Sequence, residues 1–517
     1  MADAVEAKVA AEPVLFVGLT QERAPAHAQP RKKREILPET PYRASDQALD
    51  QLITGDLTPE QRKQFNALVH EFADIFAENE DALGRTDLAK HQIRLSDTQP
   101  IKQRPYRHGY AQDKFIRAEL ARMQRLGIIR ESESPYAMPV VIVTKKGGKL
   151  RFCVDYRRLN WITIKDSYPL PRIDDLLENL AGSKYFSSID LLSGYWQVAM
   201  DEKDIEKTAF VTKYGLFEFT VMPFGLTNAP PTFQRLMDKV FRDLKNTCVA
   251  VYMDDVNIHS PTWEQHLLDL RQAFLRIRAA NLRLNIPKCH FAKPKVVFLG
   301  FVVTKEGVHT DPAKVEHMVN LKIPKDVHEL RSLLGTFSFY RRFIPNFAKE
   351  AQPLNWLLKK NRLYTWTQRQ QLAFDTLRMH LVQAPILIAP DPEQRFQLYT
   401  DASYKGFRAL LGQKDAEGKD HVVAYASCAC NKHEERYAPV ALECCAAHWA
   451  VQYFRQYLWG TEFDLYTDQA ALNSLFQKGD LNNRTLGRWL NNLQEYDFKT
   501  HYRPGKLNRA DILSRAL

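Results

Sequence analysis

The pattern of apolar and polar positions divides the chain into an irregular start and a long folded region. Residues 1–45 are rich in Ala, Pro and charged residues and lack periodicity, which predicts a flexible extension. Its basic run Arg31-Lys-Lys-Arg34 is typical of a nuclear-import or nucleic-acid patch, but so short a run favours a solvated linker. Residues 58–76 and 113–126 then carry apolar side chains at helical spacing, with Thr58 suited to an N-cap and Gly127 to a C-cap.

A strand pattern follows these helices. Residues 138–144 and 150–154 are β-branched and apolar, and Lys145-Lys-Gly-Gly-Lys149 between them predicts an antiparallel hairpin with a basic tip. Further along the chain, a strand pattern that contains an acid is found in Gln397-Leu-Tyr-Thr-Asp-Ala-Ser403. It predicts that a separate catalytic domain begins here, in addition to the one around the acids described next. Between the two strand patterns, helices are predicted at residues 173–181, 232–244, 266–279 and 312–360, and a short connector at 362–390.

Two adjacent acids, Asp254 and Asp255, stand between apolar runs and predict the tip of a β-hairpin. Adjacent carboxylates repel each other and resist desolvation, so they persist where a divalent cation neutralises them. Asp190 ends a similar run, Tyr185-Phe-Ser-Ser-Ile-Asp190. Three carboxylates on two strands suit two Mg²⁺ ions that drive an in-line attack on a phosphate. For the pair taken alone, a hairpin turn with two solvated acids is the alternative.

Composition and charge narrow the class of protein. A chain of 517 residues is too long for one core, and its apolar (45%) and charged (26%) fractions are ordinary for a globular protein. From Asp391 onward there are 16 Lys and Arg and 16 Asp and Glu, so the net charge of +11 lies entirely in the first 390 residues. Next to three acids, a basic body fits a groove that follows phosphates, although a solubilising surface explains the charge alone equally well.

The cysteines indicate a reducing compartment, and the hydropathy indicates a protein that does not span a membrane. The seven cysteines form no Cys-x-x-Cys pair, and Cys428-x-Cys430 and Cys444-Cys445 are poorly spaced for zinc, so we expect free thiols. No apolar stretch is long enough to span a membrane, and we find no secretory h-region. We therefore expect a cytoplasmic protein without a membrane partner.

Longer motifs surround the three acids in a fixed order. They are Leu150-Arg-Phe-Cys-Val-Asp-Tyr-Arg-Arg-Leu-Asn160, Tyr168-Pro-Leu-Pro-Arg-Ile-Asp174, Asp190-Leu-Leu-Ser-Gly-Tyr-Trp-Gln197, Phe217-Glu-Phe-Thr-Val-Met-Pro-Phe-Gly-Leu226, Lys288-Cys-His-Phe291, Phe298-Leu-Gly300, Leu330-Arg-Ser-Leu-Leu-Gly335 and Tyr340-Arg-Arg-Phe-Ile344. In this order and at this spacing the chain resembles the reverse transcriptases of gypsy-class LTR retrotransposons (Metaviridae), from about residue 52 to residue 517.

The resemblance implies a multidomain fold of the α+β and α/β classes. It would be a right-hand polymerase with fingers, palm and thumb, followed by a ribonuclease H-like α/β domain. The implied domains are a flexible extension (1–45), fingers and palm (46–303), thumb (304–362), connector (363–395) and ribonuclease H domain (396–517).

For the polymerase, the resemblance implies that Asp190, Asp254 and Asp255 are catalytic metal ligands. Tyr195 would be the steric gate that excludes a ribose 2′-hydroxyl, with a core aromatic as the alternative. Arg151 and either Lys145 or Lys146 would bind the triphosphate, with a solvated basic turn as the alternative for the lysines. The remaining implied substrate contacts are Phe224 and Gly225 under the incoming nucleotide, and Phe298, Leu299 and Gly300 at the primer 3′ end. Asn257 departs from the family, which usually has an apolar residue there, and it either costs stability or faces solvent.

For the nuclease, the resemblance implies four acids that bind two Mg²⁺ and activate a water: Asp401, Glu443, Asp468 and Asp511. His501, in the loop before Asp511, would assist product release; an exposed loop histidine is the alternative. In Gly406-Phe-Arg-Ala409, Arg408 replaces the second glycine of the family pattern. A bulky cation near four acids either pairs with one of them or displaces a metal, which puts the strength of the nuclease in doubt.

The implied activity is RNA- and DNA-directed DNA synthesis with degradation of the copied RNA. It would use two Mg²⁺ per site, with Mn²⁺ as a substitute, and its partners would be an RNA template, a DNA primer, an RNA–DNA hybrid and dNTPs. We expect it in retrotransposon particles in the cytoplasm with access to the nucleus, as a processed or excised part of a longer polyprotein. Monomer and substrate-induced homodimer both stay open. The rivals are a plant pararetrovirus polymerase and a domesticated, non-catalytic nucleic-acid-binding protein.

Overall fold

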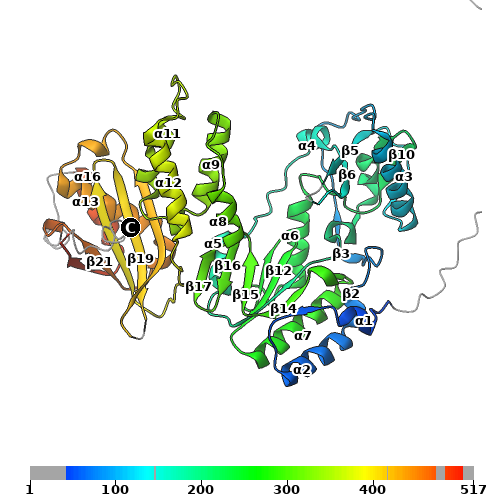
Figure 1. The fold of residues 1–517 in the computed structure, drawn as a ribbon, viewed down its shortest axis with the longest axis horizontal. Helices are drawn as coiled ribbons and strands as arrows, with labels where there is room; N and C mark the ends of the chain where they lie inside the picture. The colour runs from blue at the N-terminus through cyan, green and yellow to red at the C-terminus, as the bar shows by residue number, and fades with distance from the viewer. Residues whose placement is uncertain (1–41, 145–146, 416, 473–483, 505–517) are drawn as a thin grey trace, which may run out of the picture. The chain divides into compact units, whose positions relative to one another are not determined.

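The computed structural model describes residues 42–144, 147–415, 417–472 and 484–504 (Figure 1). The first helix, α1 (Asp46–Leu49), has Ser45 as its N-cap, whose Oγ accepts a hydrogen bond from the Ala48 N–H. The run Arg31-Lys-Lys-Arg34 and the rest of residues 1–41 lie outside the described residues. No helix in the described ranges is both long and apolar enough to cross a membrane.

Helix α2 (Pro59–Glu71) confirms the predicted N-cap, since Thr58 and Gln61 form a capping box. The prediction that this helix continues to residue 76 was wrong. The chain instead passes through a 3₁₀ turn into the short strand β2 (Phe76–Ala77). The rings of Phe72 and Phe76 pack against Phe274 from the distant helix α7 (Trp263–Ala279), and this tertiary packing overrides the local helical pattern.

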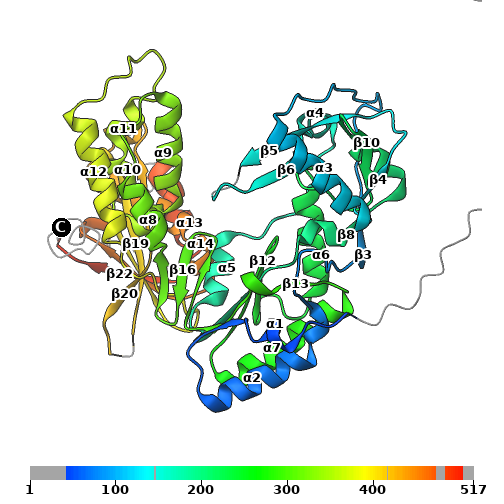
Figure 2. The same cartoon turned by 45° about the vertical axis from the view of Figure 1, so that its right-hand side comes forward.

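The region predicted as the fingers contains the predicted hairpin of β5 (Met138–Thr144) and β6 (Leu150–Val154), which run antiparallel side by side (Figure 2). Helix α3 (Tyr110–Arg125) covers this sheet, and Gly127 follows it at a φ of 63°. The sheet order is β4-β10-β9-β5-β6. The other elements here are β3 (Thr86–His91), β4 (Ile129–Glu131), α4 (Arg157–Ile162), β8 (Val198–Met200), β9 (Phe210–Thr212) and β10 (Gly215–Phe219).

The region predicted as the palm contains a five-stranded sheet of order β1-β14-β7-β12-β11. Helices α6 (Ala229–Val240) and α7 (Trp263–Ala279) pack on it and begin three residues earlier than predicted, because Pro230 and Thr262 suit a first turn and an N-cap. A large apolar core joins these helices to the sheet. The remaining elements are β1 (Ile53–Thr54), α5 (Ile173–Leu180), β7 (Tyr185–Ile189), β11 (Val249–Tyr252), β12 (Asp255–Ser260), β13 (Leu284–Asn285) and β14 (His290–Lys293).

Three strands and then helices follow the palm. The strands are β15 (Lys295–Phe298), β16 (Phe301–Thr304) and β17 (Gly307–Thr310). The predicted helical region 312–360 contains α8 (Pro312–Val319), α9 (Val327–Phe339), α10 (Phe347–Glu350) and α11 (Gln352–Trp356). The predicted connector contains the helix α12 (Gln368–Val382). Its apolar face packs into a core that it shares with these thumb-region helices.

The last domain is a mixed sheet of order β20-β19-β18-β21-β22. Strands β18, β19 and β20 are antiparallel neighbours, whereas β18, β21 and β22 run parallel. Helix α13 (Pro439–Tyr453) is apolar on nearly every side because it lies between β18 and helix α16. The bounds are β18 (Phe396–Ser403), β19 (Gly406–Lys414), β20 (Asp420–Ala429), α14 (Arg455–Leu458), β21 (Phe463–Thr467), α16 (Arg484–Leu493) and β22 (Phe498–Tyr502).

Two candidate catalytic centres

The first centre lies where the hairpin β11–β12 meets the end of β7. Asp190 follows β7 directly, and Ile189 is in register with Val256, the neighbour of Asp255. Asp190 therefore lies at the same end of the sheet as Asp255, and its charge acts on the Asp255 carboxyl group. Burial raises the pKa of Asp255, and the charges of Asp254 and Asp190 raise it further. Carboxylates that repel one another in this way favour a divalent cation between them.

The turn that carries the acid pair is held by helix α6. Met253 has a φ of 55°, which is rare for a residue with a side chain. Its N–H donates a hydrogen bond of 2.7 Å to Oε1 of Gln234, a buried residue of α6. The hydrogen bond fixes this unusual turn and so fixes where Asp254 and Asp255 point.

Lys288 supplies a positive charge to the first centre. Its Nζ lies 3.3 Å from both carboxylate oxygens of Asp190, and Nδ2 of Asn285 lies 3.4 Å from Oδ1. The lysine side chain is 63% exposed, so it is a flexible counter-charge that an entering cation displaces easily. Carboxylate oxygens are the ligands that a hard cation such as Mg²⁺ prefers.

The burial of Asn257 decides between the two alternatives predicted for it, a cost in stability or a side chain that faces solvent. It is buried on β12, opposite Ser188, and its Oδ1 has no hydrogen-bond partner among the described residues. It therefore does not face solvent, and its unpaired oxygen costs stability.

Three of the predicted substrate-binding residues form one cluster beside the acids. The rings of Tyr195 and Phe224 stack at 5.1 Å, and the Arg151 guanidinium lies 5.4 Å from the Phe224 centroid. Burial and the charge of Asp254 raise the pKa of Tyr195 to about 12. The two rings therefore lie between Asp254 and the positive charge of Arg151. Lys145 and Lys146 lie outside the described residues.

Two further sets of predicted substrate-binding residues lie in turns. Gly225 has a φ of 97°, and its carbonyl accepts a hydrogen bond from Nδ2 of Asn160. Leu299 and Gly300, with φ of 50° and 88°, form the tight turn between β15 and β16. Phe298 is buried in the core, so this turn presents only its backbone and the Leu299 side chain.

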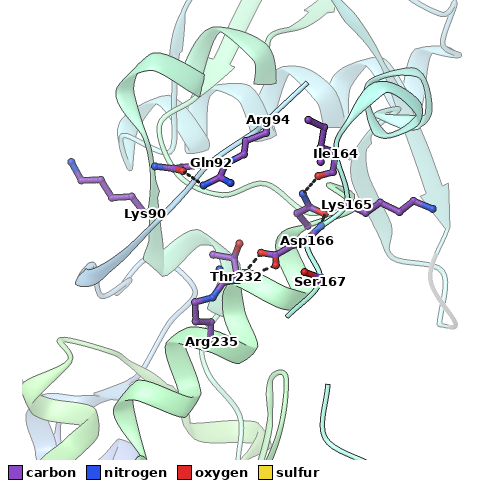
Figure 3. A pocket seen from close by; sticks show the side chains of 10 residues that line it. Lys90, Gln92, Arg94, Ile164, Lys165, Asp166, Ser167, Thr232 and Arg235 are labelled. Atoms are coloured by element: carbon purple, nitrogen blue, oxygen red, sulfur yellow. Dashed lines mark hydrogen bonds and ion pairs between the residues drawn. The ribbon is translucent and has the colours of Figure 1, made fainter. Parts of the chain in front are cut away.

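A positively charged pocket of about 300 Å³, lined in part by helix α6, was not predicted (Figure 3). Residues 90–94 form one side, residues 164–167 another and helix α6 a third. Among the described residues, Lys90, Arg94 and Lys165 form no ion pair, whereas Arg235 is bound to Asp166 at 2.7 Å. The only sequence signal is the alternation Lys90-x-Gln92-x-Arg94 around the buried Ile93. Arg235 is next to Gln234, which holds the catalytic turn, so one helix joins pocket and acids.

The second centre brings Asp401 of β18, Glu443 of α13 and Asp468, the residue after β21, into one cluster. Their ligand atoms all lie within 4.8 Å of one another, and no other group of three or more His, Cys, Asp or Glu in the described ranges does so. Oε1 of Glu443 accepts a hydrogen bond from the Ala402 N–H at 3.1 Å, while its buried Oε2 has no hydrogen-bond partner among the described residues. Burial, then Asp468 and Asp401, raise the pKa of Glu443 to about 8. An unpaired buried oxygen among acids fits a divalent cation.

Arg408 stands directly opposite Asp401 on the neighbouring strand β19. Its Nη2 lies 2.5 Å from Oδ2 of Asp401, and both side chains are largely buried. Of the two outcomes open for this cation, pairing with an acid is the one observed.

His501 was expected in a loop, and this was wrong because residues 498–502 form strand β22. The ring stacks on Tyr466 at 5.0 Å, and its Nε2 lies 3.0 Å from Oδ1 of Asp464. Parallel pairing with β21 gives the segment its regular structure. Asp511 lies outside the described residues.

Comparisons with known proteins match both parts of the chain. The family described as "Reverse transcriptase (RNA-dependent DNA polymerase)" matches residues 143–303, and the family described as "RNase H-like domain found in reverse transcriptase" matches residues 391–496. The "Retrovirus-related Pol polyprotein from transposon 297" of Drosophila melanogaster is 38% identical over 467 residues, which cover 89% of this chain and 43% of that polyprotein. The chain thus spans less than half the length of this curated relative.

Solved structures of the foamy viral protease-reverse transcriptase share the fold. The structure in complex with dsDNA matches with a TM-score of 0.79 at 23% identity, over 89% of this chain and 98% of that chain. The structure in complex with RNA/DNA hybrid matches with a TM-score of 0.71, also at 23% identity, over 88% of this chain and 62% of that chain.

Proposed function

The chain belongs to the Pol proteins of LTR retrotransposons and contains their reverse transcriptase and RNase H domains, and from this premise we propose that it copies RNA, and then DNA, into DNA and degrades the copied RNA. The predicted family and the predicted fold class, a right-hand polymerase followed by an RNase H-like α/β domain, are confirmed. The transposon relative favours a retrotransposon over a pararetrovirus as the source.

We assign the domains as the sequence suggests. Fingers and palm take residues 46–303, the thumb 304–362, the connector 363–395 and the RNase H domain 396–517. The connector carries the helix α12, so it is a structured part of the chain.

In the polymerase centre, Asp190, Asp254 and Asp255 would hold two Mg²⁺ ions, or Mn²⁺ in their place. When bound, the ions would lower the pKa of the primer 3′-hydroxyl and stabilise the leaving pyrophosphate. The protein's share of the work is to hold the acids in place. The Gln234–Met253 hydrogen bond fixes the turn, and Lys288 offsets the acid repulsion before the ions enter.

The aromatic cluster supports a role in selecting the nucleotide. Tyr195 is fixed between Phe224 and Phe233, so its ring cannot move aside for a larger sugar. We propose that it crowds the 2′ position, while Arg151 binds the triphosphate with its planar fork. Gly225 would lie below the nucleotide, and the Leu299–Gly300 turn would hold the primer end.

The positively charged pocket supports nucleic acid as the partner of the polymerase domain. Three of its basic side chains form no ion pair within the part of the chain that the structure describes, and such side chains suit backbone phosphates, which give most of the non-specific affinity for nucleic acid. The foamy viral enzyme was solved with dsDNA and with RNA/DNA hybrid, and we propose both as partners of this chain.

In the nuclease centre, Asp401, Glu443 and Asp468 would hold Mg²⁺, joined by Asp511. A bound ion would activate a water for attack on the RNA strand, which its 2′-hydroxyl distinguishes from DNA. The contact of His501 with Asp464 and Tyr466 gives this histidine a structural role, and we propose any role in product release only as secondary.

The proposal rests above all on the three carboxylates around the β11–β12 turn. The test is extension of a DNA primer on a labelled RNA template with dNTPs and Mg²⁺, with EDTA as the control. We expect EDTA-sensitive extension and cleavage of the RNA. Hybrid binding without extension or cleavage would instead indicate a domesticated binding protein.

A further inference from the structure

Arg408 occupies a fixed position beside a proposed metal ligand of the nuclease. It lies on strand β19, which pairs with β18 on one side and β20 on the other, so its backbone is held by two ladders. Its register partner on β18 is Asp401, and directly opposite residues of antiparallel strands direct their side chains to the same face of the sheet. The contact between the two is therefore built into the register of the sheet.

The pairing uses the same carboxylate that a metal would need. The Nη2 of Arg408 lies 2.5 Å from Oδ2 of Asp401. The exposed fractions of the two side chains are 17% and 11%, so water screens this ion pair weakly. Arginine keeps its charge at every physiological pH, so the positive charge is permanent.

The two proposed centres differ in this respect. In the polymerase centre the counter-charge is Lys288, which is 63% exposed and contacts Asp190 at 3.3 Å. A flexible, solvated ammonium leaves its partner at low cost. The guanidinium of Arg408 lies closer to its carboxylate partner and is more buried than the ammonium of Lys288. Its removal from Asp401 therefore costs more free energy.

We propose that Arg408 competes with the divalent cation for Asp401, so that the nuclease centre binds its metal weakly and requires a higher Mg²⁺ or Mn²⁺ concentration than the polymerase centre. This inference rests on the proposed nuclease function. Loading the centre requires the guanidinium to leave Oδ2, and no covalent bond changes. An ion pair of this kind between largely buried side chains corresponds to roughly a ten- to hundredfold loss of metal affinity.

Metal binding, measured without any turnover, tests the competition. The full chain carries Asp254→Asn and Asp255→Asn, which silence the polymerase centre, and Mn²⁺ is titrated with its free ion followed by electron paramagnetic resonance. Arg408→Gln removes the charge but keeps much of the side-chain length, and Arg408→Ala is a second variant in case the first folds poorly. Arg408→Lys keeps a positive charge and is the matched control. Glu443→Gln identifies the binding step that belongs to the nuclease.

We expect Arg408→Gln and Arg408→Ala to bind Mn²⁺ about ten- to hundredfold more tightly than the chain with Arg408. The Mn²⁺ affinity of Arg408→Lys should lie between that of the chain with Arg408 and that of these two variants. Equal affinity in folded Arg408→Gln and its parent would overturn the inference. If no variant shows a binding step that depends on Glu443, the proposed nuclease centre itself fails, so the two failures are distinguishable. The circular dichroism spectrum and melting temperature of each variant establish that it is folded.

Discussion

Lys288 holds its Nζ 3.3 Å from both carboxylate oxygens of Asp190, at the end of strand β7. The lysine follows Pro287 in a 3₁₀ turn, nearly a hundred residues further along the chain, so only the fold brings the two together. In both proposed centres a basic side chain thus contacts a proposed metal ligand, Lys288 on Asp190 and Arg408 on Asp401.

Replacing Lys288 with Gln should shift the pH dependence of DNA synthesis. The charge of Lys288 lowers the pKa of Asp255, while burial, Asp254 and Asp190 raise it. Without Lys288 the carboxyl group of Asp255 stays protonated to a higher pH, so the acidic limb of the extension rate should move to a higher pH. Single-turnover extension between pH 5 and 8 measures this limb. Lys63→Gln, an exposed lysine of α2, is the control and should leave it in place.

Replacing Glu443 with Gln should stabilise the metal-free protein at high pH. Its ordinary pKa of 4.5 applies in the unfolded chain, and burial with Asp468 and Asp401 raises it to about 8 in the fold. Between these values the folded state holds a proton that the unfolded chain has released, so stability falls as the pH rises. Gln cannot ionise and removes this loss.

The melting temperature in EDTA, measured at pH 5 and pH 8.5, tests this expectation. The gain of Glu443→Gln over the unmutated chain should be larger at pH 8.5. A gain that is the same at both pH values would show that Glu443 is not strained by its charge.

The positively charged pocket should contribute to the salt dependence of nucleic-acid binding. Arg94→Gln with Lys165→Gln should weaken binding of an RNA–DNA hybrid and make the slope of log K against log salt shallower by about one per lost phosphate contact. Fluorescence anisotropy at several salt concentrations gives the slope. The double variant Lys63→Gln with Lys114→Gln removes the same charge from other exposed positions. If both double variants change the slope equally, the pocket has no special part in binding.

Tyr195 should control the choice of sugar. Tyr195→Ala removes the ring that is fixed between Phe224 and Phe233, and incorporation of ribonucleotides relative to deoxynucleotides should rise roughly ten- to hundredfold. Tyr195→Phe keeps the ring and should behave like the unmutated chain. Primer extension with each nucleotide class measures both. Unchanged discrimination in a folded Tyr195→Ala would favour the alternative of a core aromatic.

Local patterns predicted the strands well where the chain folds on its own neighbours. The hairpin β5–β6 and the pair β11–β12 connect residues a few positions apart, so turn chemistry and alternation sufficed. Helix α12 was missed although Thr367 and Gln370 give a capping box and Phe374, Leu377 and Leu381 lie on one face. That signal was present in the sequence.

Features that depend on distant residues were not predictable in the same way. The charged pocket joins residues 90–94, 164–167 and helix α6, which no local pattern connects. The end of α2 was misplaced because Phe76 packs against Phe274, almost 200 residues away. The Arg408–Asp401 pair was foreseen only as one of two outcomes, because the register of β18 and β19 decides it.

The most direct test of the two-centre account is a pair of reciprocal variants in one assay. A DNA primer on a labelled RNA template is extended with Mg²⁺ and dNTPs by Asp254→Asn and by Glu443→Gln. We predict that Asp254→Asn loses extension by at least about a thousandfold but still cleaves the RNA of a preformed hybrid, and that Glu443→Gln extends the primer but leaves the RNA intact. Extension that persists in Asp254→Asn would contradict the assignment of the polymerase centre to the β11–β12 turn.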